Sequence, residues 1–199
     1  RYNDEVWGGE VTLFYIDFSD ELQYVSNDVG WTNLGATKHT GIETSAHYDL
    51  SNLDPRLEGL SANAGFTYTR ATAEGDVAFK GRDLPLYSRQ VATLGLRYAV
   101  NHWTHNLDAY AQSGQRAPGT TSTYITQPTA DGQYGDIPGY VSVNVRSGYD
   151  FGAQLSNLKL GVGVKNLFDQ QHYTRSSDNN AGIYLGEPRT FFVQASVGF

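Results

Sequence analysis

The chain has 199 residues, with 14 Lys or Arg against 21 Asp or Glu, so its formal net charge is −7. Proteins that bind nucleic acid neutralise phosphates with basic side chains, so this acidic balance argues against nucleic acid as a partner. The chain contains no cysteine, which excludes disulfide scaffolds, thiolate metal sites and cysteine nucleophiles. Its length suits one domain or at most two.

Hydrophobic side chains alternate along the chain rather than gather in runs. No run approaches the 18 apolar residues of a membrane-spanning helix, and the 22 glycines and 13% aromatic residues are typical of a β-rich protein. The mean hydropathy of −0.45 fits a soluble protein and a transmembrane β-barrel equally, because a barrel hides its apolar content in every second residue. Because the chain starts at Arg1 without Met or a signal segment, we expect a processed or excised chain.

The alternation predicts an all-β protein with eight strands and no helix of ten residues or more. In each strand the apolar residues share one side; in the first, these are Phe14, Ile16 and Phe18. Every proline falls in a connection or at a strand start, where no ladder hydrogen bond is lost. The predicted strands cover residues 10–18, 32–48, 57–70, 88–99, 104–115, 139–151, 158–167 and 189–199.

The connections between these strands alternate in length. Residues 49–56, 100–103 and 152–157 form short links, whereas residues 19–31, 71–87, 116–138 and 168–188 form long polar ones. Tight turns on one rim and long loops on the other are the plan of an outer-membrane barrel, whose short turns are periplasmic. We therefore expect an antiparallel up-and-down barrel with both chain ends on the periplasmic rim.

Aromatic residues lie where the two interfacial girdles of such a barrel belong. Trp7 and Trp103 are close to short links, and Trp31, Tyr24 and Tyr184 are close to long ones. A period of two does not tell whether the apolar face points outward to lipid or inward to a dry core. A soluble antiparallel barrel with an apolar interior is therefore the alternative at this point.

The histidines do not form a metal site in this pattern. His102 and His105 are an odd number of residues apart, so a strand sends them to opposite faces. His39 and His47 share a face but lie ~26 Å apart along a strand, too far to bind one ion.

Catalytic and nucleotide-binding motifs are also missing from the sequence. Gly161 and Gly163 lie inside a strand with no helix after them, so they do not form a phosphate loop, and we expect them to leave room for a close neighbour. No serine sits in a nucleophile elbow. Charged residues on the strands fall mainly on the polar face, as a hydrated lumen requires, and include Glu43, Asp108, Arg146, Lys159 and Lys165.

The most specific motifs begin at residue 161. They are residues 161–169 (GVGVKNLFD), 173–175 (YTR) and 182–190 (GIYLGEPRT), followed by an alternating strand that ends in Phe199. Residues 34–43 (LGATKHTGIE) add a Gly-x-Glu strand, and Leu84 and Pro85 precede the fourth strand. Together these segments resemble the TonB-dependent outer-membrane receptors, and residues 175–180 with 184–189 are most similar to ferric citrate receptors.

The resemblance implies a transmembrane barrel of 22 strands that is closed by an amino-terminal plug. We expect residues 1–199 to be the carboxyl-terminal segment of such a barrel, so that the eight strands are its last part. The plug, the TonB box and the earlier strands are then expected to lie outside the sequence. The implied location is the bacterial outer membrane.

The implied activity is uptake of a ferric siderophore, with ferric citrate as the closest candidate, and no catalysis. The iron chelate is the transported ligand, and the resemblance implies no covalently bound cofactor. The implied partners are the TonB energy-transducing complex, acting through the plug, outer-membrane lipid, and the insertion machinery that reads the strand ending in Phe199.

The same resemblance places ligand-binding residues in the long loops. Asn179, Asn180 and Arg175 of the last loop are expected above the lumen, and Gln23 and Asn27 of the first loop are further candidates. Amide and guanidinium groups suit citrate, because its carboxylates accept several hydrogen bonds.

Two other functions stay open from the sequence. One is a self-contained eight-stranded outer-membrane barrel with a structural or adhesive role. The other is an outer-membrane hydrolase, for which Asp108 and His105 are the residues to test.

Overall fold

A computed structural model describes residues 1–26, 30–33, 35–75, 80–117, 135–176 and 183–198. Strands dominate the described residues, and the helical elements among them are short 3₁₀ turns. None of these helices is both long enough and apolar enough to cross a membrane.

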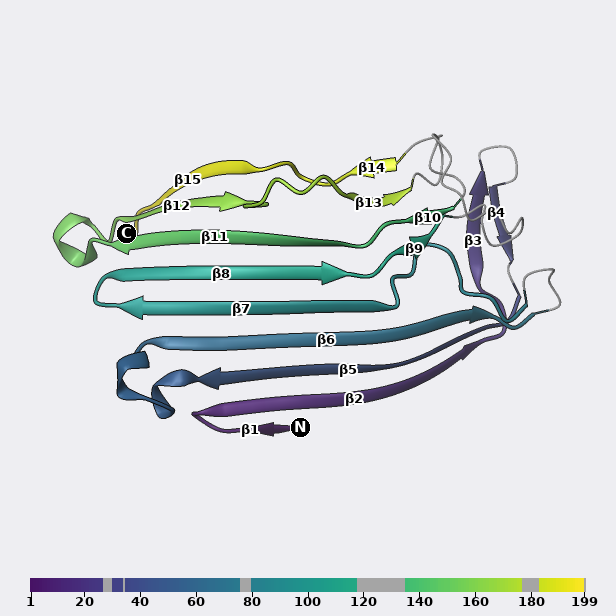
Figure 1. Ribbon diagram of the computed structural model, residues 1–199, viewed down its shortest axis with the longest axis horizontal. Coiled ribbons are helices and arrows are strands. Elements are labelled where there is room, and N and C mark those ends of the chain that lie inside the picture. The colour runs from purple at the N-terminus through teal and green to yellow at the C-terminus, as the bar shows by residue number, and fades with distance from the viewer. Residues whose placement is uncertain (27–29, 34, 76–79, 118–134, 177–182, 199) are drawn as a thin grey trace.

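The long strands form one antiparallel sheet in which each strand pairs with its neighbours along the chain (Figure 1). This arrangement confirms the predicted meander of eight strands, to which a two-residue strand, β1 (Tyr2–Asn3), is added at one edge. In sheet order, the eight are β2 (Trp7–Phe18), β5 (Thr37–Asp49), β6 (Leu60–Ala73), β7 (Gln90–Val100), β8 (Trp103–Gln112), β11 (Tyr140–Asp150), β12 (Lys159–Lys165) and β15 (Thr190–Ser196).

Two predicted strands are divided in the structure. The segment at 32–48 is split into β4 (Gly30–Asn33) and β5, because Gly35 has a φ of 75°, which a continuous strand does not accommodate. The segment at 104–115 is likewise divided into β8 and β9 (Gln115–Arg116). The second piece leaves the main sheet and pairs with β10 (Asp136–Ile137).

The connections alternate in length, as predicted. The short links on one side contain the 3₁₀ turns η1 (Leu50–Asn52), η2 (Pro55–Leu57) and η3 (Gly152–Leu155), while β7 and β8 meet through a two-residue turn (Figure 1). The long connections on the other side contain β9 and β10 and two hairpins, β3 (Leu22–Ser26) with β4, and β13 (Tyr173–Ser176) with β14 (Ile183–Leu185). We call this side the mouth of the sheet.

The register assigns every strand residue to a face, because directly paired residues of an antiparallel ladder lie on the same side. One row across five strands is entirely apolar and consists of Leu96, Leu107, Val145, Val164 and Phe191. The neighbouring row on the other face includes Gly95, Asp108 and Asn144. We call these two sides the apolar face and the polar face.

The first predicted strand needs a correction. Phe14, Ile16 and Phe18 do share a face, but Phe14 pairs with Gly41 on the polar face. The apolar face of β2 is instead formed by the alternate residues, among them Leu13, which is 77% exposed and pairs with Ile42. Phe14 lies on the polar face because its ring covers the bare backbone of Gly41, where a Cβ atom would collide with the ring.

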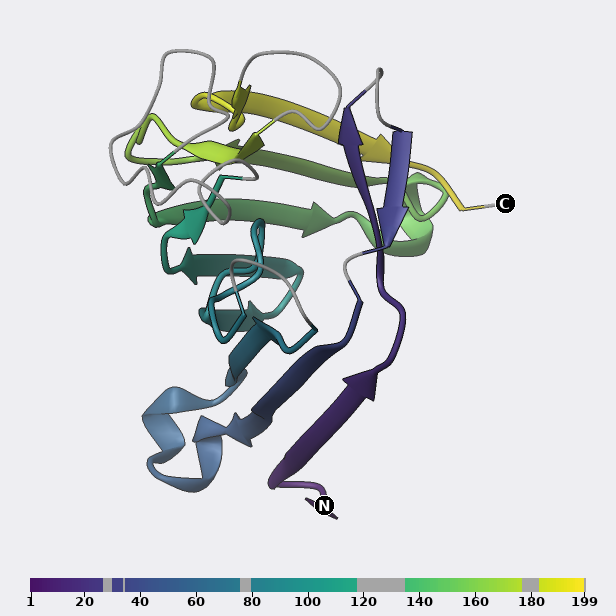
Figure 2. The ribbon, with the colours of Figure 1, turned by 90° about the vertical axis from the view of Figure 1, so that its right-hand side faces the viewer.

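The sheet is strongly curved and open (Figure 2). A closed eight-stranded barrel requires β15 to pair with β2. Within the described chain β15 lies at one end of the strand order, and β2 lies at the other, where its outer neighbour is the two-residue β1. The structure therefore does not support a self-contained eight-stranded barrel.

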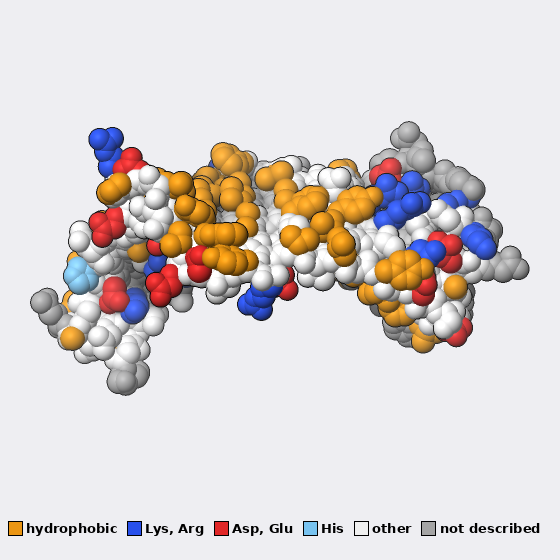
Figure 3. Space-filling model, turned by 90° about the horizontal axis from the view of Figure 1, so that it is seen from below, with side chains coloured by type: hydrophobic (Ala, Val, Ile, Leu, Met, Phe, Trp, Pro, Cys, Tyr) orange, Lys and Arg blue, Asp and Glu red, His pale blue; other side chains and the backbone are white. Residues whose placement is uncertain are grey.

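Side chains are distributed as in a membrane-spanning wall. Hydrophobic side chains gather over the middle of the molecule, and most charged ones lie toward its two ends (Figure 3). At the short-turn end the rings of Trp103 and Tyr149 pack edge to face at 4.8 Å, and Trp7 stacks on Tyr2 at 4.4 Å, so a girdle is present there.

A small buried cluster of Ala71, Ala73 and Leu84 lies at the mouth. For the predicted girdle at the mouth, Tyr184 is the only one of the three aromatic residues whose side chain is described, and it is exposed.

Candidate functional site at the mouth of the barrel wall

The polar face is the side of the sheet opposite the apolar face. It carries charged groups on several strands, and the register places the predicted residues Glu43, Asp108, Arg146, Lys159 and Lys165 on it. Gly161 and Gly163 also lie on this face. A Cβ atom at Gly163 would collide with the ring of Phe192, which confirms that this glycine makes room for a close neighbour. At Gly161 a Cβ atom would lie 3.4 Å from Nε of Arg146, an ordinary contact distance, so the expectation is not confirmed there.

One polar cluster at the mouth joins the first long connection to β5. Glu21 accepts a hydrogen bond from the Thr37 hydroxyl, and its Oε2 lies 3.2 Å from Nε2 of His39. Thr37 and His39 are buried, with 1% and 7% of their surface exposed. Phe18 closes the cluster by packing edge to face on the His39 ring at 5.3 Å. The first long loop is therefore fastened to the wall through the half-buried carboxylate of Glu21.

The second long connection reaches the same cluster through Tyr87. The Tyr87 ring packs against His39 at 5.4 Å. Burial raises the pKa of the Tyr87 hydroxyl, and the negative charge of Glu21 raises it further. The hydroxyl therefore remains protonated at neutral pH and acts as a hydrogen-bond donor.

A second cluster on the polar face is aromatic and lies under the last long connection. Tyr140, the first residue of β11, stacks on His172 with ring centroids 4.0 Å apart and lies 5.8 Å from Tyr110 of β8. The Tyr110 hydroxyl donates to Oε1 of Gln112 at 2.9 Å. Within the described residues, the buried Nε2 of Gln112 has no hydrogen-bond partner. An unpaired buried amide is unfavourable, so this group is suited to an additional acceptor.

Two arginines add positive charge to the mouth. Arg82 lies in the second long connection and Arg116 in β9. Burial lowers the pKa of the Arg82 guanidinium, and the nearby positive charge of Arg116 lowers it further. The Arg82 guanidinium nevertheless stays cationic at neutral pH, because the pKa of an arginine is ordinarily far above that range. The mouth therefore carries two arginine side chains close to each other, although the chain is acidic overall.

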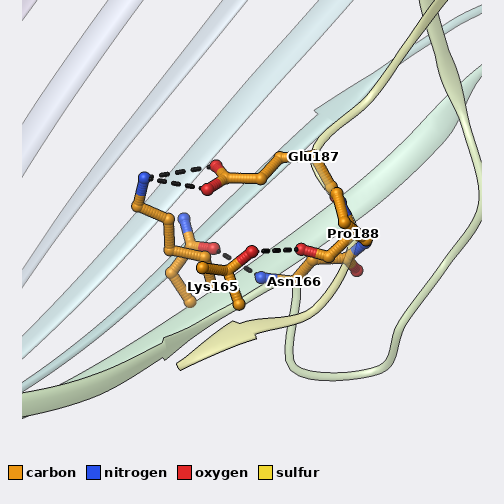
Figure 4. A network of polar contacts seen from close by, with 6 residues as sticks. Lys165, Asn166, Glu187 and Pro188 are labelled. Carbon is orange, nitrogen blue, oxygen red and sulfur yellow. Dashed lines mark hydrogen bonds and ion pairs between the residues drawn. The ribbon is translucent and has the colours of Figure 1, made fainter. Parts of the chain in front are cut away.

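The GVGVKNLFD motif fixes the point where the last long connection leaves the wall (Figure 4). The side chain of Asn166 is buried, with 3% of the residue exposed. Its Nδ2 donates to the carbonyl oxygens of Gln170 and Glu187 at 2.9 and 3.0 Å, and its Oδ1 accepts from the backbone amide of Gln170 at 3.0 Å. Lys165 pairs with Glu187 at 3.2 Å, and Asp169 accepts from the backbone amide of Arg189 at 3.0 Å.

This motif therefore ties β12 to the start of β15. Asn166 and Asp169 both have φ near 50°, a conformation that Asn and Asp tolerate better than most residues. Both side chains also bond nearby backbone groups, Asn166 those of Gln170 and Glu187 and Asp169 that of Arg189. Sequence reasoning missed the other mouth clusters, since their partners are distant in the chain.

The residues predicted to bind the ligand are not tested by this geometry. Asn179, Asn180 and Asn27 lie outside the described residues. Gln23 belongs to β3, where its backbone pairs with Thr32, and Arg175 belongs to β13, but their side chains are likewise outside the described part of the structure. Their role as a ligand site stays a prediction.

Candidate catalytic and metal-binding groups are not brought together. His105 pairs with Ser147 on the apolar face, whereas Asp108 pairs with Asn144 on the polar face, so these two side chains share no site. Among the described residues, no cluster of three His, Asp or Glu side chains could hold a metal ion.

Comparison with known proteins decides the family. The family model described as TonB dependent receptor-like, beta-barrel matches residues 1–167. The chain belongs to this TonB-dependent receptor family. The wall is therefore part of a bacterial outer-membrane barrel, and its apolar face is the lipid-facing one.

Similar TonB-dependent receptors extend well beyond the length of this chain. The solved structure of the ferric citrate transporter FecA in its unliganded form is 38% identical, with a TM-score of 0.87, over 99% of this chain and 30% of that one. The metal-pseudopaline receptor CntO of Pseudomonas aeruginosa is 26% identical over 84% of this chain and 22% of its own length. The ferric yersiniabactin uptake receptor FyuA from Yersinia pestis shares the fold, with 16% identity and a TM-score of 0.78 over 100% of this chain and 28% of that one. The described sheet is thus a segment of a larger barrel.

Proposed function

We propose that this chain is the carboxyl-terminal part of the barrel of a receptor that imports a ferric siderophore, with ferric citrate as the substrate. The observation that carries the proposal is the 38% identity to the ferric citrate transporter FecA over 99% of this chain. The function is transport, and no step of it requires a catalytic residue in this wall.

The proposed receptor has 22 strands and an amino-terminal plug, with residues 1–199 forming the last eight long strands. The open edges of the sheet support this arrangement, because unpaired strand edges do not occur in lipid. The TonB complex acts on the plug, so its energy reaches this wall only through contacts between plug and barrel. The insertion machinery recognises the last strand, β15, together with the residues that follow it in the sequence up to Phe199.

The mouth of the wall supports binding of an anionic chelate. Arg82 and Arg116 provide positive charge, and Nε2 of Gln112 can donate a hydrogen bond. In the proposed site, Asn179, Asn180 and Arg175 of the last connection and Gln23 and Asn27 of the first donate hydrogen bonds to the citrate carboxylates. Such hydrogen bonds to charged groups are stronger than neutral ones.

Replacing Asn179 by alanine in the complete receptor is expected to weaken binding of ferric citrate about tenfold, the size of one hydrogen bond to a charged group. Binding is measured by titration calorimetry with the purified receptor. Asn52→Ala is the matched control, because Asn52 lies in η1 at the opposite rim and is exposed.

An unchanged affinity in Asn179→Ala would remove this residue from the site. If the wild-type receptor does not bind ferric citrate but binds metal-loaded pseudopaline, the substrate named in the proposal is wrong. Loss of iron uptake without a TonB complex tests the transport function independently of either chelate.

A further inference from the structure

The lipid-facing side of the wall contains a hollow of about 700 Å³ near its periplasmic half. Its floor is the apolar row that runs across β7, β8, β11, β12 and β15, from Leu96 to Phe191. The next row on the same face lies two residues closer to the short turns along each strand. It consists of Tyr98, His105, Ser147, Val162 and Val193.

Polar groups on a lipid-facing surface need partners, and this second row contains three of them. Nδ1 of His105 lies 2.8 Å from the Ser147 hydroxyl. If the hydroxyl donates to Nδ1, the other ring nitrogen, Nε2, carries the proton. Within the described residues neither Nε2 of His105 nor the Tyr98 hydroxyl has a hydrogen-bond partner, so two donors are available at one edge of an apolar hollow.

The His105 ring is held in a fixed orientation. It stacks on two rings, Trp103 at 5.8 Å with 6° between ring planes and Tyr98 at 6.2 Å with 19°. Trp103 also packs on Tyr149 and belongs to the girdle at the short-turn end. Trp and Tyr girdles lie at the level of lipid headgroups, so the two donors lie at the depth where phosphate and ester oxygens of a lipid are found.

We propose that this hollow is a binding site for one glycerophospholipid of the periplasmic leaflet. One acyl chain lies along the apolar row, and His105 and Tyr98 donate hydrogen bonds to the phosphate. The hollow is continuous with the surface that contacts the bilayer, and its polar edge adjoins the periplasmic girdle. Both observations favour a membrane lipid of this leaflet over a protein partner.

The test uses the complete receptor, which is extracted in mild detergent and incubated with phosphatidylglycerol before native mass spectrometry. The expected result is one retained lipid per receptor. In His105→Ala the retained fraction is expected to fall about tenfold, as for loss of one hydrogen bond to a charged group. His102→Ala is the control. His102 packs, like Trp103, against the Tyr149 ring of the girdle, but it does not line the hollow.

A second variant tests the hollow without touching its polar edge. Val162→Phe places a larger side chain in the hollow on an exposed lipid-facing position, so folding is expected to be preserved while lipid is lost to a similar extent. Diacylglycerol, which lacks the phosphate, is expected to bind at least tenfold more weakly. Equal retention by wild type, His105→Ala and Val162→Phe, or equal binding of diacylglycerol and phosphatidylglycerol, would overturn the proposal.

Discussion

Replacing Leu13 by arginine is expected to cause a large loss of assembled receptor in the outer membrane. Leu13 lies in the middle of β2, is 77% exposed and belongs to the lipid-facing side. A charged side chain at that depth costs about 2–4 kcal/mol. The loss is measured as the fraction of receptor that migrates as the compact, unheated form in SDS gels of outer-membrane extracts.

The neighbouring substitution Thr12→Arg provides the control. Thr12 is also exposed but lies on the opposite face, where it pairs with Glu43, so an arginine there meets water and an acidic neighbour. Its assembly is expected to match wild type. If both variants assembled equally well, or Thr12→Arg were the worse of the two, the assignment of the faces would be wrong.

Asn166→Ala is expected to destabilise the junction between β12 and β15 by about 2–4 kcal/mol. The substitution removes three hydrogen bonds from a buried side chain, each worth about 1 kcal/mol, and leaves backbone groups of Gln170 and Glu187 without partners. The expected result is a lower urea midpoint for unfolding of the receptor in phospholipid vesicles.

Asn157→Ala separates the loss of these hydrogen bonds from backbone strain. Asn157 has a φ of 52°, close to the 48° of Asn166, but its exposed side chain makes no hydrogen bond within the described chain. The strain of an alanine in this conformation is therefore common to both variants. A urea midpoint that falls equally in both would show that the Asn166 side chain does not stabilise the junction.

Most of the wall could be predicted from the sequence because a barrel strand has to alternate. Each of the eight strands was expected near its observed position, and the alternation of short and long links predicted the two rims. The division of the predicted strand at 32–48 was missed because its signal is a single backbone angle at Gly35, and glycine is compatible with a strand as well as with a turn.

The error on β2 also has a physical cause. Hydropathy assigns Phe14 to the lipid side, but its ring covers Gly41 across the strand pair, and Phe192 covers Gly163 in the same way at the other end of the sheet. An aromatic side chain can therefore lie on the polar face when a glycine opposite it leaves the backbone bare. An aromatic residue opposite a glycine can be recognised in the sequence only when the strand register is known.

The candidate site was less predictable than the wall. Asn166 and Asp169 could be found because they belong to a compact motif. The contact between Glu21 and His39 and the stacking of Tyr140 on His172 join segments 18 and 32 residues apart, so no local spacing reveals them. Loops carry no periodic signal, which is why their tertiary contacts required the structure.

The most direct test of which face meets the lipid is a pair of cysteine substitutions in β15. Because the chain has no cysteine, Val193→Cys and Gln194→Cys each introduce the first thiol into this wall. A fluorophore attached to the thiol is measured in vesicles of brominated phospholipid, whose acyl chains quench fluorescence by contact. Val193 is 79% exposed on the lipid-facing side, so its label is expected to be strongly quenched while the Gln194 label is not. Quenching at Gln194 with none at Val193 would contradict the account.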